Sequence, residues 1–160
     1  MRKYPKFSDK LDTALETIKE FPKKRLFEQF GFTGDIEDLT EKNDDFREVV
    51  YTGKNTQLVL MSLNPGESIG LEEHDVDQFF RIEEGEGEVE INGEITSIGP
   101  GSGIIVPAGS SHNVINTGDE DLKIYSLYSP PHHKDKVIHR TKDEAQSDDE
   151  HFDGETTEDY

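Results

Sequence analysis

The sequence predicts an all-β domain, a sandwich or barrel, with a helical arm before it and an acidic tail after it. Three observations lead to this prediction. Short runs rich in Val, Ile, Leu, Tyr and Phe recur between turn residues, as in small antiparallel β domains. The chain has 160 residues and 31% hydrophobic content, enough to bury one core but hardly two. The segments on either side of these runs differ from them in periodicity or in charge.

The N-terminal arm and linker, residues 1–45, have the pattern of an amphipathic helix. Ser8 is a suitable N-cap and Pro22 ends the helix. The apolar residues at helical spacing are Phe7, Leu11, Ala14, Leu15, Ile18 and Phe21. Residues 1–30 contain eight Lys or Arg and five Asp or Glu, a charge of +3, so the remainder of the −19 chain carries −22. We therefore expect the arm to lie on the acidic body of the protein or on a partner subunit.

The predicted barrel spans residues 46–130 and contains seven strand-like runs. These are Arg47 to Tyr51, Gln57 to Leu63, Gln78 to Ile82, Glu88 to Ile91, Ile104 to Val106, His112 to Ile115 and Leu122 to Tyr128. Turns such as Asn92-Gly93 and Gly118-Asp119 separate them. The residues expected to pack the barrel are Val59, Met61, Leu63, Phe80 and Ile82.

The C-terminal segment, residues 131–160, is predicted to be a disordered acidic tail. No Lys or Arg follows Lys142. The acidic residues after it are Asp143, Glu144, Asp148, Asp149, Glu150, Asp153, Glu155, Glu158 and Asp159. Such a run repels itself and buries little surface. Two readings stay open for His132 and His133, which follow two prolines: an added ligand at the barrel mouth, or a surface loop.

Two motifs place candidate metal ligands on strands. The stretch Gly101 to Asn116 predicts a strand, a Pro-Ala-Gly turn and a second strand that carries His112. Upstream, Glu72 and His74 are two residues apart and so share one face of an extended segment, and Gln78 opens the next apolar strand. The four side chains Glu72, His74, Gln78 and His112 could therefore converge on one ion.

Both stretches resemble the paired motifs of the cupin superfamily. The intervals from Gly66 to Gly85 match its first motif, although Glu72 stands where the family usually has a histidine and Gln78 where it has a glutamate. The second motif matches at every defining position, and the resemblance extends over residues 46–128. It implies a single cupin β-barrel, also called a jelly roll or double-stranded β-helix, which holds a metal in its mouth.

Two imidazoles, a carboxylate and an amide oxygen suit a divalent ion such as Zn, Mn, Fe, Co or Ni. With no cysteine in the chain, thiolate sites for softer metals have no ligands. The alternative is a barrel without metal, in which His74 and His112 are hydrogen-bonded to Glu72 and Gln78 as a polar plug.

Charge and hydropathy exclude several partners. A chain of net charge −19 without clustered Lys and Arg is a poor ligand for nucleic acid. No apolar stretch approaches the roughly 18 residues of a membrane span, and the start lacks the apolar core of a signal peptide. We expect a cytoplasmic protein whose partner is a small molecule.

Three functions are compatible with this site. Among cupins, the phosphomannose isomerases are similar in ligand type, with the amide and carboxylate positions exchanged, which implies a metal-dependent sugar isomerase. Arg81 alternates out of phase with Gln78 and Phe80 and should point away from the site, which favours a neutral or weakly charged sugar. The alternatives are a non-haem-metal dioxygenase, which would use two histidines and one carboxylate, and a non-catalytic binding or sensing protein.

A homodimer is expected, because cupin barrels commonly pair through edge strands and the apolar arm needs a surface to cover. Gel filtration of the full chain and of a chain without residues 1–34 tests this expectation. The truncated chain should form a smaller species or lose solubility. An unchanged oligomer of equal solubility would show that the arm has no part in assembly.

Overall fold

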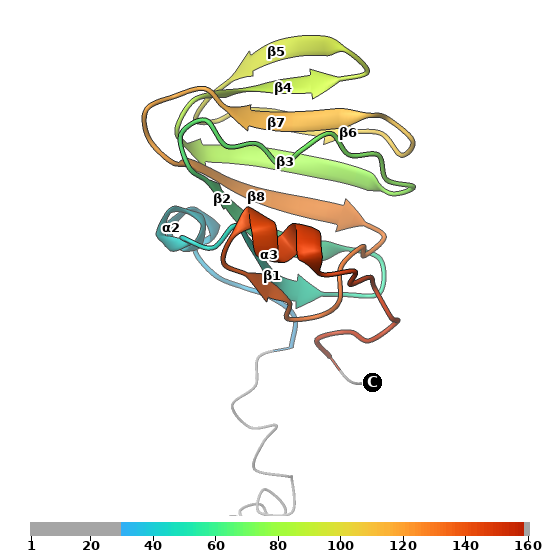
Figure 1. Ribbon diagram of the computed structural model, residues 1–160. Coiled ribbons are helices and arrows are strands. Elements are labelled where there is room, and N and C mark those ends of the chain that lie inside the picture. Colours follow the sequence, from blue (N-terminus) through green and yellow to red (C-terminus); the bar gives the residue numbers. More distant parts are fainter. Residues whose placement is uncertain (1–29, 159–160) are drawn as a thin grey trace, which may run out of the picture. The chain divides into compact units, whose positions relative to one another are not determined.

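The computed structural model describes residues 30–158, and from Gly31 onward these belong to one compact unit (Figure 1). The elements in this part of the chain are α2 (Ile36–Lys42), β1 (Arg47–Thr52), β2 (Gln57–Leu63), β3 (Asp77–Glu84), β4 (Gly87–Ile91), β5 (Glu94–Ile98), β6 (Gly103–Val106), β7 (His112–Asn116), β8 (Leu122–Ser129), β9 (Ile138–His139) and α3 (Lys142–Ser147). The all-β prediction is confirmed. The helix predicted around Phe7 to Phe21 lies outside the described residues.

The strands form two antiparallel sheets. The larger has the order β6-β3-β8-β2-β1-β9 and the smaller the order β5-β4-β7. Figure 1 shows the smaller sheet at the top of the view and β8, β2 and β1 below it. The chain passes from the larger sheet to the smaller through Gly85 and Glu86, between β3 and β4. Isolated bridges from Ser68 and Glu72 to β7 continue the smaller sheet beyond its third strand.

One apolar core fills the space between the sheets. The larger sheet contributes side chains such as Phe80 and Ile124, and the smaller contributes Val89 and Val114. The five residues predicted to pack the barrel, Val59, Met61, Leu63, Phe80 and Ile82, are all buried in this core. Burial of each such side chain contributes about 1.5 to 3 kcal/mol to folding.

All seven predicted strands are present, with ends within about one or two residues of the predicted ones. The sequence did not indicate β5, because four of its five residues are exposed and it has no apolar face to reveal it. The linker prediction did not include α2 either. This short helix has Asp35 as its N-cap, whose side chain accepts a hydrogen bond from Asp38 N–H at 3.1 Å. Within residues 30–158, no helix is long and apolar enough to cross a membrane.

The prediction of a disordered acidic tail is wrong for the described part of that segment. Helix α3 begins after Thr141, whose side chain caps it, and Glu150 is buried beside His133. Further along, Phe152 N–H donates to the carbonyl of His132 at 2.9 Å. A few buried contacts between distant residues thus hold a segment whose composition alone indicates disorder.

The close approach of β4 to its neighbours gives a stability prediction. A Cβ on Gly87 would lie closer to the carbonyl oxygen of Ile115 than van der Waals contact permits, and 3.1 Å from the side chain of Leu122. Gly87→Ala should therefore lower the free energy of unfolding by roughly 3 kcal/mol in urea denaturation. Gly99→Ala is the control, because a Cβ there meets nothing closer than 3.9 Å. Equal stability of the two variants would contradict this account of the packing.

Candidate metal centre and pocket

The backbone brings the two motifs together. Glu72 and His112 each donate a backbone N–H to the carbonyl of the other, at 2.8 Å in both directions. His74 follows Glu72 by two residues, and its carbonyl accepts a hydrogen bond from Gly109 N–H at 2.7 Å. Asp77 binds the same turn, since its carboxylate accepts from Ala108 N–H at 2.9 Å. The segment before β3 is thus held against the start of β7.

This pairing gathers three of the four predicted ligands within metal-binding reach of one another. One ligand atom from each of Glu72, His74 and His112 lies within 4.8 Å of the others. Oε2 of Glu72 is 3.2 Å from Nε2 of His74. His112 is almost fully buried, while His74 and Glu72 keep partial access to solvent. A small molecule can therefore approach the cluster from the side of Glu72 and His74.

The fourth predicted ligand, Gln78, faces the same point. Its amide nitrogen donates to Oγ of Ser126 at 3.0 Å, and its Oε1 lies 3.2 Å from Nε2 of His112. Nδ1 of His112 lies 3.0 Å from the carbonyl of Ser110, which can only accept, so Nδ1 carries the proton of the neutral ring. Nε2 of His112 and Oε1 of Gln78 therefore each direct a lone pair at the other, and neither has a hydrogen to donate. A cation shared by these two atoms would turn their repulsion into attraction.

The surroundings favour the ligand forms of these groups. Burial acts to raise the pKa of the Glu72 carboxyl, but the hydrogen bond with His74 and the nearby guanidinium of Arg47 oppose it, and the pKa is lowered overall. Burial also lowers the pKa of His112, against the opposing effects of Ser110 and Glu72. An ionised carboxylate and a neutral imidazole result, and these are the forms that bind a divalent metal.

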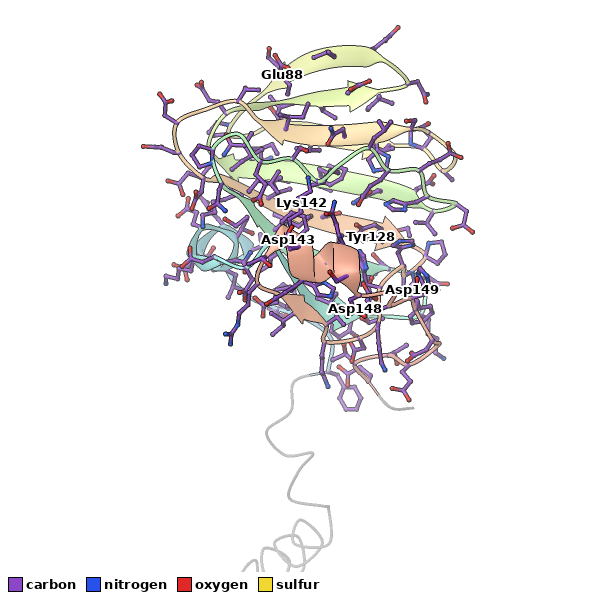
Figure 2. The ribbon with its side chains drawn as sticks, viewed as in Figure 1. Glu88, Tyr128, Lys142, Asp143, Asp148 and Asp149 are labelled. Atoms are coloured by element: carbon purple, nitrogen blue, oxygen red, sulfur yellow. The ribbon has the colours of Figure 1, made fainter. Side chains whose placement is uncertain are left out.

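A pocket of about 320 Å³ opens beside Glu72 and His74. Its wall comes from distant parts of the chain: the start of β1, the segment before β3, the two histidines after β8, and the segment from α3 onward. The lining residues are Phe46, Arg47, Ile69, Gly70, Leu71, Glu72, His74, His132, His133, Ala145, Gln146, Asp148, Glu150 and His151. In Figure 2, Asp148 and Asp149 follow α3 on the same side of the view as Tyr128. The acidic segment thus forms one side of the pocket.

The two histidines after β8 belong to this pocket. The ring of His132 stacks on Tyr128 with centroids 5.4 Å apart and lies 4.3 Å from the ring of His74. Nδ1 of His133 donates to Glu150 at 2.6 Å, so its Nε2 accepts from the hydroxyl of Tyr128 at 3.2 Å. Burial raises the pKa of Tyr128, which keeps this hydroxyl protonated. Of the two positions left open by the sequence, the barrel mouth is the one observed.

Comparison with known proteins agrees with the fold. The family model described as a cupin domain matches residues 59–128. The Bacillus subtilis protein YrkC, described as uncharacterized, is 45% identical over 130 residues, which cover 75% of this chain and 70% of YrkC. This chain belongs to the cupin superfamily. The predicted cupin barrel is therefore confirmed.

Two further relatives of this cupin match different fractions of its chain. The crystal structure of BH2720 from Bacillus halodurans has a TM-score of 0.74 and 40% identity, and the match covers 76% of this chain and 98% of that one. An oxalate-binding protein of Thermotoga maritima is 35% identical over 68 residues, which cover 42% of this chain and 56% of that protein.

Arg47 and Glu150 line the pocket of this cupin, and neither was predicted from the sequence. A signal was present for Arg47, because it shares the inward phase of β1 with Val49, and a charged residue in that phase is unusual. No local pattern could have indicated Glu150, since its partner His133 is 17 residues away and its burial depends on the fold.

His132 gives this cupin a predictable pH dependence. Burial, followed by the charges of His133 and His74, lowers the pKa of His132 from 6.5 to about 4. Between these values the unfolded chain binds more protons than the folded one, so stability falls as the pH falls through this window. With the ring partly exposed, we expect His132 to contribute about 1 to 2 kcal/mol of this loss.

Urea denaturation at pH 7 and pH 4.5 in the presence of a chelator measures this effect. His132→Gln should lose less stability on acidification than the wild type. His151→Gln, at an exposed histidine, is the control and should behave as the wild type. An unchanged pH dependence in His132→Gln would contradict the assignment.

Proposed function

We propose that this cupin binds a divalent metal ion through Glu72, His74, Gln78 and His112, and a small chelating molecule in the adjacent pocket. The convergence of Glu72, His74 and His112, whose ligand atoms lie within 4.8 Å of one another, carries the proposal, and Oε1 of Gln78 lies 3.2 Å from Nε2 of His112. Two ligands that each lie about 2.1 Å from one ion are about 3 Å apart when they are neighbours in its coordination shell. The polar plug would require the opposite orientation of the Gln78 amide, in which its nitrogen would donate to Nε2 of His112 and the Ser126 hydroxyl would donate to its oxygen.

The chain orients two of the ligands, His112 and Gln78, before any ion arrives. Ser110 holds the tautomer of His112, and Ser126 holds the amide of Gln78. Such outer partners orient ligands and preserve their affinity for the metal. A bound divalent ion would act as a Lewis acid toward a carbonyl, hydroxyl or carboxylate oxygen of the ligand.

The pocket supports a small polar ligand. Its volume of about 320 Å³ lies at the lower end of small-molecule sites, and its wall includes His132, His133 and Arg47. A relative that is named for binding oxalate supports the same class of ligand, although the match covers 42% of this chain. The cavity of about 390 Å³ beside β4 and β5 has no such set among the described residues, where its lining is Val89, Ile91, Asn92, Glu94 and Thr96.

Two reactions fit this centre. The isomerase predicted from the sequence needs a proton acceptor near the bound molecule, and His132 offers a neutral imidazole 4.3 Å, ring to ring, from His74. The dioxygenase draws support from the two histidines and one carboxylate of the cluster. The identity of the bound metal chooses between them, because iron with oxygen-dependent turnover favours oxidation, whereas zinc or manganese without it favours isomerisation. A loaded protein with neither reaction would be a binding protein.

Metal content, measured by elemental mass spectrometry on the untagged protein, tests the proposal. The wild type should carry about one divalent ion per chain, and His112→Ala should lose most of it. His151→Ala is the matched control, because this histidine is exposed and lies outside the cluster. Failure to take up Zn, Mn, Fe, Co or Ni when each is supplied would contradict the proposal and favour the metal-free polar plug.

A further inference from the structure

Arg47 is a buried cation in the wall of the pocket. It is the first residue of β1, and its inward phase places it beside the pocket that Glu72 and His74 also line. Only 8% of the residue is exposed. Among the described residues that line this pocket, it is the only Lys or Arg. A buried guanidinium without full pairing is costly, so its position calls for a partner.

Within the described residues, the hydrogen bonding of the Arg47 guanidinium is incomplete. Its Nε is buried and has no hydrogen-bond partner. Its Nη1 lies 4.0 Å from Oε1 of Glu150, beyond hydrogen-bond distance. The same Glu150 oxygen already accepts from His133 at 2.6 Å, and the other oxygen accepts from Lys134 N–H at 2.8 Å. A guanidinium offers five N–H donors, and the buried Nε–H of Arg47 is available to a ligand.

The charges around the pocket indicate the charge of the ligand that Arg47 would bind. A divalent ion and Arg47 together would carry +3, while Glu72 and Glu150 carry −2, which leaves one positive charge in the wall. The carboxylate of Asp148 is half exposed and bound to His139 at 3.0 Å, so water screens it. A ligand with one negative charge would balance the site.

We propose that the pocket selects a small 2-hydroxy- or 2-oxo-carboxylate, and that Arg47 binds its carboxylate. This inference rests on the proposed metal centre, toward which the hydroxyl or carbonyl oxygen of the acid would point. Arg47 provides the planar, forked donor that a carboxylate matches. Arg81, whose outward position favoured a neutral sugar, lies outside this pocket and pairs with Glu83 at 3.4 Å.

Isothermal titration calorimetry on the metal-loaded protein tests the inference with two probes of equal size, glycolate and its neutral amide, glycolamide. The wild type should bind glycolate at least about 10-fold more tightly than glycolamide. Arg47→Gln should weaken glycolate binding by roughly 10- to 100-fold, leave glycolamide unchanged and keep its metal content. Arg81→Gln is the matched control and should bind both probes as the wild type does.

Several results would overturn the inference. Equal affinity of the loaded wild type for acid and amide, or binding of neither, would remove the carboxylate preference while leaving the metal centre intact. Full glycolate affinity in Arg47→Gln, or an equal loss in Arg81→Gln, would show that Arg47 is not the anchor. If Arg47→Gln does not fold, the comparison of probes on the wild type still tests the carboxylate preference. Failure of the wild type to load any metal would instead remove the proposed function, and this inference with it.

Discussion

The reciprocal hydrogen bonds between Glu72 and His112, each 2.8 Å long, are the contact on which the site depends. They join a segment without regular structure to the first residue of β7, far from it in the sequence. The bond from Gly109 to the His74 carbonyl and the bond from Ala108 to Asp77 tie the preceding turn to the same segment. Because the backbone is fixed on both sides, the side chains of Glu72, His74 and His112 meet without a large loss of conformational freedom on binding.

The second constraint is the docking of the chain after β8 onto the larger sheet. Gln57 is fully buried in β2 and binds this segment through both ends of its amide. Its nitrogen donates to the carbonyl of His133 at 2.7 Å, and its oxygen accepts from the backbone N–H groups of His132 and His133. Glu150 then binds His133 from the other side. In this way an amide and a carboxylate hold the acidic segment in place despite its charge.

Electrostatics explain how a chain of net charge −19 is compatible with the proposed site for an anion. The acidic residues are spread over a solvated surface, where salt and water screen them. Inside the pocket, screening is weaker, and a few groups decide the local potential. Burial acts to raise the pKa of Glu72 and that of Tyr128, and the positive charge of Arg47 opposes this effect at both groups, so its charge reaches the cluster. Net charge therefore describes the solubility of this protein and not the ligand it selects.

The sequence by itself determined the class of the fold, the seven main strands and the candidate ligand set, because alternation, turn residues and motif spacing are local properties of the chain. It could not indicate β5, whose residues are mostly exposed, nor the order of residues 131–158, whose composition indicates disorder. The pocket wall was decided only by the tertiary structure. Arg47, His132 and Glu150 meet there through sheet order and through buried contacts between residues far apart in the chain, and no local pattern encodes which distant groups will share a buried space.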